Sequence, residues 1–254
     1  MPISIRQNEI LDLARSEGRV LVDDLARRFE VTLQTIRRDL SELAEAGLLD
    51  RVHGGAVPRS GMVNLGYEAR RRMNAEAKAA IGRACAAQIP DNSSVILNIG
   101  TTTEAVARAL LGHRNLTVVT NNMNVANIMI HNDSCEVIVA GGAVRRSDGG
   151  LVGELTTQFF EQFKVDYAVI GTSALDIDGD LLDFDLAEVR VSRAILRQAR
   201  RAFLVTDHSK LGRPAPARIA SLSEIDTVFT DQPLPRALAA RCADWGTTVR
   251  LCPP

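Results

Sequence analysis

The chain has 254 residues, which is long enough for two domains that each bury a sizeable core. Its hydrophobic share of 46%, its charged share of 24% and its net charge of −1 are ordinary for a globular protein and indicate no particular partner. The sequence shows neither a signal-peptide pattern nor an apolar run long enough to cross a bilayer, so we expect a cytoplasmic protein. Its four cysteines are scattered without a CxxC pair, so we expect no zinc site, no disulfide framework and no cofactor.

Three short amphipathic patterns follow one another near the start of the chain. Apolar residues recur at helical spacing in each of them: Ile10, Leu13 and Ala14; then Val22, Leu25, Ala26 and Phe29; then Ile36, Leu40 and Leu43. The third pattern follows Thr32, whose hydroxyl can cap the N-terminus of a helix. This order predicts a helix-turn-helix, whose second helix enters a DNA major groove.

The outward face of the third predicted helix carries side chains of the kind that read DNA. Arginine pairs with guanine and glutamine with adenine through two hydrogen bonds each. An Arg-Arg pair is more often a solvated helix face, and residues 1–60 are not basic overall, so the arrangement rather than the charge favours DNA binding. We expect Gln34, Arg37 and Arg38 to meet bases or phosphates, and Thr32, Thr35, Arg51 and His53 to position the domain on DNA.

Residues 47–56 predict a wing after the third helix. The glycine that opens this segment suits a helix C-terminus, and two short strands can flank a tight turn at Gly54-Gly55. Arg51 and His53 then lie near the tip of the wing, within reach of a minor groove or a phosphate. Together these patterns predict a winged helix-turn-helix DNA-binding domain over residues 1–57.

The pattern breaks over residues 58–74. Pro58, Gly61 and Gly66 interrupt it, and Arg70-Arg71-Arg72 forms a short basic run. We interpret this segment as a linker that leads into a helix, with the three arginines on a solvated helix face.

From residue 75 to residue 254, helical patterns alternate with nearly continuous apolar runs. Helices are expected at 75–88, 103–111, 122–130, 154–162 and 187–200. Buried strands are expected at 94–99, 116–120, 136–140, 166–171, 202–206 and 227–230, before a last helix and strand. This order predicts an open, mostly parallel α/β domain, whose ligands bind outside the carboxyl ends of the strands.

Small polar residues follow the predicted strands at those carboxyl ends. After the first strand, Gly100 allows close backbone approach, three threonines add hydroxyls, and the helix start offers free N–H groups. Because the chain has no GxGxxG after this strand and no Walker lysine, the pattern favours a phosphorylated polyol or sugar over a nucleotide. The contacts expected at these strand ends are Gly100, Thr101, Thr102, Thr103, Asn121 and Gly142.

Charged side chains suit the remainder of a polyol phosphate. Its hydroxyls need acceptors, and several acidic residues lie between positions 178 and 188. Of these we expect Asp183 and Glu188 to touch the ligand, while Lys210 offers a positive charge to the phosphate or to one of the acids. The four histidines share no metal-ligand spacing, so no metal site is expected.

Several motifs resemble the DeoR family of bacterial transcriptional regulators. They are Gln34-Thr35-Ile36-Arg37-Arg38-Asp39-Leu40, Arg51-Val52-His53-Gly54-Gly55-Ala56, Ile99-Gly100-Thr101-Thr102, Val119-Thr120-Asn121-Asn122 and Ala140-Gly141-Gly142. The resemblance covers nearly the whole chain and implies a sugar-phosphate sensor domain related to ribose-5-phosphate isomerase. Two positions depart from the family pattern: Leu33 stands where many members carry proline, and Leu211 where phenylalanine is usual.

Three further motifs are similar to the family's repressors of glycerol-3-phosphate metabolism: Asp148-Gly149-Gly150, residues 182–190 and Asp207-His208-Ser209-Lys210. This resemblance implies a repressor of glycerol uptake and catabolism genes that sn-glycerol-3-phosphate releases from its operator. One DNA-reading head makes too few contacts to be specific, so we expect a homo-oligomer, at least a dimer, on a palindromic operator. Another phosphorylated sugar as effector remains an open alternative, as does activation rather than repression.

The same resemblance raises an enzymatic alternative. An aldose–ketose isomerase needs a carboxylate base and a group that stabilises the enediolate, which Asp183, Glu188 and Lys210 can supply. An attached helix-turn-helix gives ligand binding a use without turnover, so we expect a sensor and not an enzyme.

Overall fold

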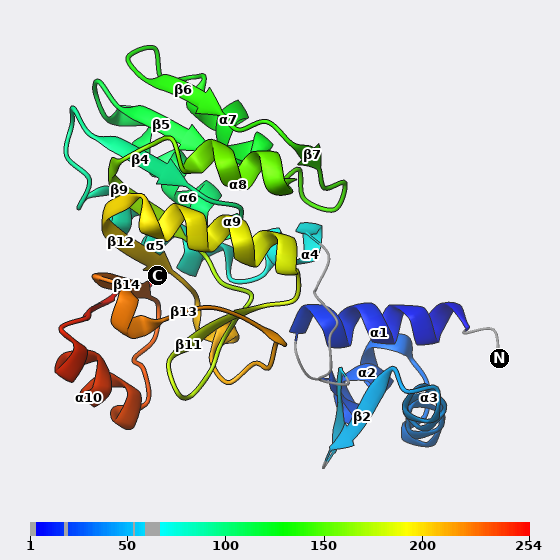
Figure 1. The fold of residues 1–254 in the computed structure, drawn as a ribbon. Helices are drawn as coiled ribbons and strands as arrows, with labels where there is room; N and C mark the ends of the chain where they lie inside the picture. Colours follow the sequence, from blue (N-terminus) through cyan, green and yellow to red (C-terminus); the bar gives the residue numbers. More distant parts are fainter. Residues whose placement is uncertain (1–3, 18–19, 53, 59–66) are drawn as a thin grey trace. The chain divides into compact units, whose positions relative to one another are not determined.

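The computed structural model describes residues 4–17, 20–52, 54–58 and 67–254. The chain divides into two compact units, Met1–Met73 and Asn74–Pro254. Figure 1 shows both units and labels most of their helices and strands.

The first unit is a winged helix-turn-helix, as predicted. Its elements in chain order are α1 (Ile5–Glu17), β1 (Val20–Leu21), α2 (Val22–Phe29), α3 (Leu33–Glu45), β2 (Leu49–Val52), β3 (Gly55–Pro58) and α4 (Tyr67–Arg72). The expected apolar positions of the three helices build one core, in which Ile10, Ile36 and Leu40 are fully buried. Helix α4 lies within the segment expected to be a linker, and its last turn holds the three arginines.

A three-stranded antiparallel sheet closes this unit, in the order β1-β3-β2. The wing strands β2 and β3 were predicted, whereas β1 was not, because two residues are too few to show a periodicity. Gly55 of β3 lies so close to β1 that a Cβ there would stand 2.0 Å from the carbonyl oxygen of Val20. Only glycine fits at this crossing of the two strands.

The second unit is built on one seven-stranded sheet in which all neighbouring strands are parallel, as predicted. Its strands, in spatial order, are β15 (Thr248–Leu251), β14 (Thr227–Thr230), β12 (Ala199–Val205), β9 (Val165–Ile170), β4 (Ser94–Leu97), β5 (Thr117–Thr120) and β6 (Glu136–Val139). Along the chain, β4 is followed in space by β5 and β6 on one side. The later strands β9, β12, β14 and β15 then extend the sheet on the other side. The strand order therefore reverses between β4 and β9, and open sheets bind ligands at the carboxyl ends of such a pair.

Helices cover both faces of this sheet (Figure 1). On one face lie α5 (Ala75–Ala86), α6 (Thr101–Ala109) and α7 (Met123–Met129), and on the other lie α8 (Glu154–Phe160), α9 (Leu186–Arg197) and α10 (Arg236–Trp245). Side chains of β4 alternate between the two cores: Ile96 packs with α8 and α9, and Val95 and Leu97 pack with α5 and α6. Such burial on both faces explains why the strands are apolar throughout.

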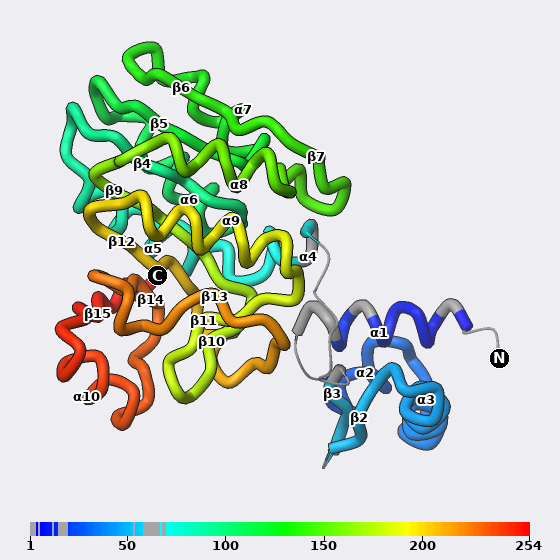
Figure 2. The backbone as a smooth tube through the Cα atoms, viewed as in Figure 1, coloured from blue at the N-terminus to red at the C-terminus, as the bar shows by residue number. Residues whose placement is uncertain are grey.

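Two small sheets, which the sequence pattern did not predict, join the second unit. One is the hairpin of β7 (Ala143–Val144) and β8 (Leu151–Val152). The other is antiparallel, in the order β10-β11-β13, and consists of β10 (Ala174–Leu175), β11 (Asp180–Asp183) and β13 (Ala217–Ser221), which lie together in Figure 2. Three single 3₁₀ turns complete the described part of this unit: Leu110–Gly112, His208–Lys210 and Leu222–Glu224.

Several predicted helix boundaries differ from those of the structure by two or three residues. The helix expected at 187–200 ends at Arg197, because Ala199 already pairs with Val165 of β9. The exposed Arg200 and Arg201 interrupt the apolar pattern at the start of β12, so this part of the strand looked helical. The helix expected at 103–111 begins earlier, at Thr101, and the one expected at 154–162 ends at Phe160.

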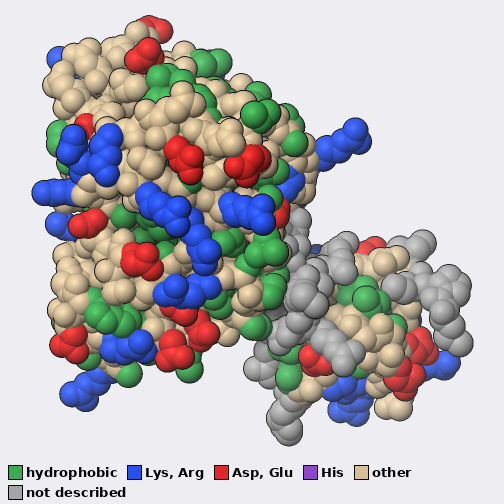
Figure 3. Space-filling model, in the orientation of Figure 1, with side chains coloured by type: hydrophobic (Ala, Val, Ile, Leu, Met, Phe, Trp, Pro, Cys, Tyr) green, Lys and Arg blue, Asp and Glu red, His purple; other side chains and the backbone are tan. Residues whose placement is uncertain are grey.

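Helix α9 shows how charge and apolar residues divide between two faces of one helix. Val189 and Ile195 are buried against the sheet, while Arg190, Arg193 and Arg197 recur at helical spacing on the outer side. Lys and Arg side chains gather over α9 in Figure 3. Arg193 also donates from Nε to the carbonyl of Ile219 at 3.0 Å, so this face ties β13 to the helix.

Candidate functional site

The N-terminus of α3 is capped as the sequence predicts. The Oγ1 of Thr32 accepts the backbone N–H of Thr35 at 3.2 Å and lies 2.9 Å from the Oγ1 of Thr35. Thr32 and Gln34 are exposed and Thr35 is half-buried. The cap thus fixes the first turn of α3, which in a helix-turn-helix is the turn that approaches the bases.

The two adjacent arginines of α3 differ in what they bind. Arg38 donates from Nε to Glu42 Oε1 at 3.0 Å, one turn along the helix. Within the described part of the chain, the exposed guanidinium of Arg37 has no hydrogen-bond or ion-pair partner. Arg37 is therefore available for a bidentate contact, whereas Arg38 must first leave Glu42.

Arg51 of the wing is bound to α3. Its Nη1 donates to the carbonyl oxygen of Arg37 at 3.0 Å and to the Oγ of Ser41 at 2.8 Å. The wing strand and the helix are thus joined on the exposed side of the unit, consistent with a positioning role for Arg51. His53 lies outside the described residues, so its predicted role stays an expectation.

Helix α1 holds α3 from the other side. Asp39 is buried, and its Oδ2 accepts a hydrogen bond from the Nε of Arg6 at 2.6 Å. Gln7 donates from Nε2 to Glu42 Oε2 at 2.6 Å. The hydrogen bond from Arg38, followed by that from Gln7, lowers the pKa of Glu42. These contacts fix the rotation of α3, and therefore which of its side chains face outward.

In the second unit, the loop after β4 lies at the carboxyl end of this strand, where the strand order reverses between β4 and β9. Gly100 has φ +150°, which disfavours a residue with a side chain, and α6 begins at the next residue. Thr101 is half-buried and Thr102 is 7% exposed. Thr103 is fully buried, and its hydroxyl oxygen lies within hydrogen-bond distance of the carbonyls of Asn98 (2.8 Å) and Gly100 (2.7 Å), which share its one proton, so it shapes the loop.

Asn121 is buried at the end of its strand, whereas Gly142 is exposed. Asn121 is fully buried and donates from Nδ2 to the carbonyl of Leu151 at 3.0 Å, while its Oδ1 has no hydrogen-bond partner in the described part of the chain. Gly142 has φ +140°, and a Cβ there would stand 2.2 Å from Thr156 Oγ1. Glycine is therefore required by packing at this position, whether or not a ligand approaches it.

Arg145 joins three carboxylates at the same edge of the sheet. It binds Asp148 at 2.7 Å, Asp185 at 2.9 Å and Glu188 at 2.6 Å, and thereby links the β7–β8 hairpin to the start of α9. Burial, and next the charge of Asp183, raises the pKa of Glu188 to about 7, although Arg145 opposes this rise. Burial lowers the pKa of Arg145 itself, but the hydrogen bond with Asp148 and the nearby carboxylate charges outweigh burial and raise it.

The predicted ligands Asp183 and Glu188 belong to this same cluster. Asp183 is 1% exposed, and its Oδ1 accepts the backbone N–H groups of Phe184 (2.7 Å) and Asp185 (3.0 Å). Glu188 keeps 13% of its side chain exposed. Asp183 is therefore occupied by the backbone through one oxygen, and Glu188 is the more accessible acid of the two.

Lys210 lies in the 3₁₀ turn after β12, where its charge acts on Asp207. Burial alone would raise the pKa of Asp207, but the hydrogen bond from Ser209, the charge of Lys210 and the hydrogen bond from Asn74 together lower it. The Nδ2 of Asn74 donates to Asp207 Oδ1 at 2.9 Å. The charge of the buried Lys78, one turn along α5, also acts on this carboxylate.

The predicted effector residues thus lie at the carboxyl edge of the seven-stranded sheet, where they form separate groups. A chain of contacts links two of these groups, since Asn124 donates from Nδ2 to Glu104 Oε1 of α6 and to the carbonyl of Asp148, both at 3.1 Å. No group of three or more His, Cys, Asp or Glu in the described ranges could hold a metal ion. None of the helices described here is long and apolar enough to cross a membrane.

Two family models match the chain, one in each unit. Residues 6–60 match the DeoR-like helix-turn-helix domain, and residues 73–232 match the DeoR C-terminal sensor domain. The chain belongs to the DeoR family. The predicted family and fold class are confirmed. The prediction of a DNA-binding repressor rather than an enzyme is also confirmed, because relatives that align over nearly the whole length of this DeoR protein are repressors.

Two relatives and one solved structure illustrate the similarity. The DeoR chain is 45% identical to the glycerol-3-phosphate regulon repressor of Escherichia coli K12, over 97% of this chain and 98% of the relative. It is 40% identical to the transcriptional repressor CsqR of the same organism, over 94% and 92%. Among solved structures, ribose 5-phosphate isomerase from Methanocaldococcus jannaschii matches with a TM-score of 0.41 and 12% identity, over 54% of this chain and 55% of that one.

Four polar residues of the DeoR sensor unit were not among the predicted site residues: Asn74, Lys78, Arg145 and Asp207. For Lys78 a signal exists, because it precedes Ile81 and Cys85 by three and seven residues and so lies on the apolar face of its helix. A lysine on such a face must find a partner. Asn74 gave no signal, because its partner Asp207 lies 133 positions further along the chain.

Proposed function

We propose that this DeoR-family repressor controls genes of glycerol and glycerol-3-phosphate metabolism and leaves its operator when sn-glycerol-3-phosphate binds the sensor unit. The observation that carries the effector class is the start of α6 after Gly100, at the reversal of strand order. The observation that favours the glycerol pathway is the 45% identity to a repressor of that regulon.

On DNA, the outer face of α3 would lie in a major groove. Gln34, Arg37 and Arg38 would meet bases or adjacent phosphates, while Thr32 and Thr35 position the first turn. Arg51 would hold the wing against α3 through its bonds to Arg37 and Ser41. We keep His53 in this set on the sequence pattern alone.

In the sensor, the effector phosphate would sit on the N–H groups at the start of α6, beside Gly100, Thr101 and Thr102. Thr103 would hold the loop in shape from below. Lys210 would supply a point charge to the phosphate.

The hydroxyl groups of the effector need acceptors, and two buried side chains suit that role. Asn121 has an Oδ1 without a partner in the described part of the chain, and Glu188 is the accessible acid of its cluster. Asp183 would act on the ligand through Glu188. Burial is the largest cause that raises the pKa of Glu188, and the charge of Asp183 is the next. Gly142 would keep the β7 side of the site free of a side chain.

We further propose that the repressor acts as a homo-oligomer, at least a dimer, on a palindromic operator. One α3 helix offers few side chains for base contacts, and specific recognition needs more of them than a single head supplies. Two-fold symmetry of the protein would match two half-sites about one helical turn of DNA apart.

A second candidate effector is a different phosphorylated sugar. The positions Leu33 and Leu211, which depart from the family pattern, lie at the start of α3 and just after Lys210.

The test uses the full-length chain and a DNA site that it selects from random sequence. Release of this DNA is followed by fluorescence anisotropy, and stabilisation by thermal unfolding, with phosphorylated three-, five- and six-carbon compounds. Release and stabilisation by sn-glycerol-3-phosphate alone support the proposal. Release by a five- or six-carbon phosphate instead keeps the repressor and reassigns its pathway.

A further inference from the structure

Three arginines form a row along the outer face of α9. Arg190, Arg193 and Arg197 are exposed and follow one another at intervals of three and four residues, so they lie on one side of the helix. Seven residues of an α-helix rise about 10 Å, which is the length of this α9 arginine row. The row belongs to the basic surface over α9 in Figure 3. Neither the effector site nor the DNA-reading face of α3 uses it.

The charges of the α9 arginine row are not neutralised by carboxylates. The guanidinium groups of Arg190 and Arg197 have no hydrogen-bond or ion-pair partner among the described residues. Arg193 donates from Nε to the carbonyl of Ile219 at 3.0 Å and from Nη2 to the carbonyl of Arg218 at 2.6 Å. Carbonyl oxygens carry no net charge, so Arg193 is held in place and keeps its full positive charge.

Lys164 adds a further positive charge at the C-terminal end of the row. Its Nζ donates to the backbone carbonyl of Arg197 at 3.3 Å, which is again a neutral acceptor. The neighbouring helix α8 carries the exposed acids Glu154 and, at its end, Glu161. Glu154 accepts a hydrogen bond from Gln158 at 3.1 Å, and neither acid forms an ion pair with the row in the described part of the chain.

Two other arginines near α9 differ from the row, because acids bind them. Arg218 lies 2.9 Å from Asp180, and Arg200 lies 3.7 Å from Asp166. The chain as a whole has a net charge of −1. The row is therefore a local concentration of unpaired positive charge and not the consequence of a basic chain. Such a surface attracts a polyanion.

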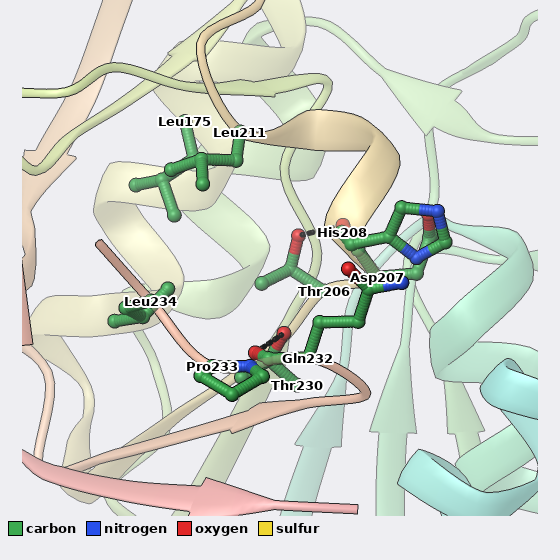
Figure 4. Close-up of a pocket in the computed structure, with 9 residues that line it drawn as sticks. All are labelled: Leu175, Thr206, Asp207, His208, Leu211, Thr230, Gln232, Pro233 and Leu234. Atoms are coloured by element: carbon green, nitrogen blue, oxygen red, sulfur yellow. Dashed lines mark hydrogen bonds between the residues drawn. The ribbon is translucent and has the colours of Figure 1, made fainter. Parts of the chain in front are cut away.

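The pocket of the sensor unit is unsuited to a polyanion. It lies at the carboxyl ends of β12 and β14, and its lining includes one acid and neither lysine nor arginine (Figure 4). The lining residues are Leu175, Thr206, Asp207, His208, Leu211, Thr230, Gln232, Pro233 and Leu234. On α9, by contrast, the exposed positions hold only the row and Leu186. This face presents positive charge without an amide or carboxylate side chain, a composition that suits phosphates.

We propose that the α9 arginine row binds the sugar-phosphate backbone of the DNA duplex beside the operator, while the first unit holds the operator itself. Duplex DNA carries one negative charge per about 1.7 Å of its axis, so a row about 10 Å long meets several phosphates. Both units belong to one chain, so binding of the first unit raises the effective concentration of flanking DNA around the sensor unit. This contact goes beyond the proposed function, since it requires neither an effector nor the effector site.

The test compares two duplexes on the full-length chain without effector. The short duplex holds only the selected operator, about 20 base pairs for two half-sites one helical turn apart. The extended duplex adds about 20 base pairs, or two turns, of unrelated sequence at each end. Fluorescence anisotropy gives the affinity for each duplex at several salt concentrations. We expect the parent to bind the extended duplex more tightly and with a salt dependence steeper by about two charges or more.

Removing two exposed charges of the row tests its role without disturbing the bonds of Arg193. In the double variant Arg190→Gln, Arg197→Gln, we expect about tenfold weaker binding of the extended duplex at low salt and a slope smaller by about two. Binding of the short duplex should stay within about twofold of the parent, because its phosphates are used by the first unit. The variant Arg190→Lys, Arg197→Lys keeps both charges and should bind both duplexes as the parent does.

A matched control removes two charges elsewhere on the sensor unit. Arg83 is exposed on α5, which covers the opposite face of the sheet, and Arg114 is exposed in the loop before β5. The double variant Arg83→Gln, Arg114→Gln should bind both duplexes as the parent does.

Three outcomes overturn the proposal. An unchanged affinity of the Arg190→Gln, Arg197→Gln variant for the extended duplex shows that the row does not touch DNA. An equal loss on both duplexes shows that the row acts through folding or through contact with a second copy of the chain. An equal loss in the Arg83→Gln, Arg114→Gln control shows that net charge decides the affinity and the position of the row does not.

Discussion

At the scale of single residues, we expect the loss of Arg37 and the loss of Arg38 to weaken operator binding by different amounts. Arg37→Ala should weaken binding to the selected operator by about 1–3 kcal/mol if it pairs with a guanine. Arg38→Ala should cost less, because Arg38 must give up its bond to Glu42 before it meets DNA. The measurement is fluorescence anisotropy at one fixed salt concentration, since phosphate contacts depend on salt. Arg28→Ala, which removes the same charge from an exposed position of α2, is the control, and a loss equal to that of Arg37→Ala would leave Arg37 with no specific role.

Thr101, at the first position of α6, tests the effector site. Thr101→Asp puts a negative charge where the effector phosphate is proposed, and like charges about 4 Å apart repel by about 4 kcal/mol at an effective dielectric constant near 20. We expect normal operator binding and a loss of effector affinity of about 100-fold or more, measured by calorimetry. Thr101→Ser, which keeps the hydroxyl, should respond to effector as the parent does. If the effector concentration that releases the parent from DNA also released the Thr101→Asp variant, the effector phosphate could not bind at this position.

At the scale of elements, the cluster around Arg145 joins the β7–β8 hairpin to α9 and makes stability depend on pH. The pKa of Glu188 rises from 4.5 to about 7 in the folded chain. Between these values the unfolded chain releases this proton and the folded chain keeps it, so the contribution of Glu188 to the free energy of unfolding falls as pH rises. Urea unfolding from pH 5 to pH 8 should show a loss of up to about 3 kcal/mol for the parent relative to Glu188→Gln. The exposed Glu161→Gln variant is the control, and parallel curves for the parent and Glu188→Gln would contradict the assignment.

How far the sequence predicts these elements depends on their length and surroundings. Parallel strands such as 94–97 were found because burial on both faces makes them apolar throughout. Strand β11 was missed because it is short, has an acidic residue at each end, and pairs with β13, 34 to 41 positions away in the sequence. The Thr32 cap is a local contact over three residues and was predicted, whereas the Arg145–Glu188 contact spans two elements and was not. Local patterns therefore predicted the site's loops, and only the folded chain shows which distant side chains meet there.

At the scale of the whole molecule, the proposed release from the operator requires effector binding to change the affinity of the first unit for DNA, with a coupling typically of about 1–3 kcal/mol. The chain enters the sensor unit at Asn74, whose backbone is left-handed, with φ 52°. Its side chain does not cap α5 and instead donates to Asp207. Asp207 caps the turn that holds Lys210, and the charge of Lys210 acts on it, so we expect a phosphate that draws Lys210 toward itself to act on the partner of Asn74.

Asn74→Gly removes this bond but keeps the left-handed backbone without strain. We expect effector affinity within about threefold of the parent, while the effect of saturating effector on operator affinity falls from the usual 5–150-fold toward one. Calorimetry gives the first quantity, and anisotropy with and without effector gives the second. Asn92→Gly replaces another left-handed asparagine, which bonds to Asn115 on an exposed loop, and should keep the parent's coupling. Equal coupling in the two glycine variants would show that the signal leaves the sensor by another route, since only the Asn74 variant breaks a contact to the loop that holds Lys210.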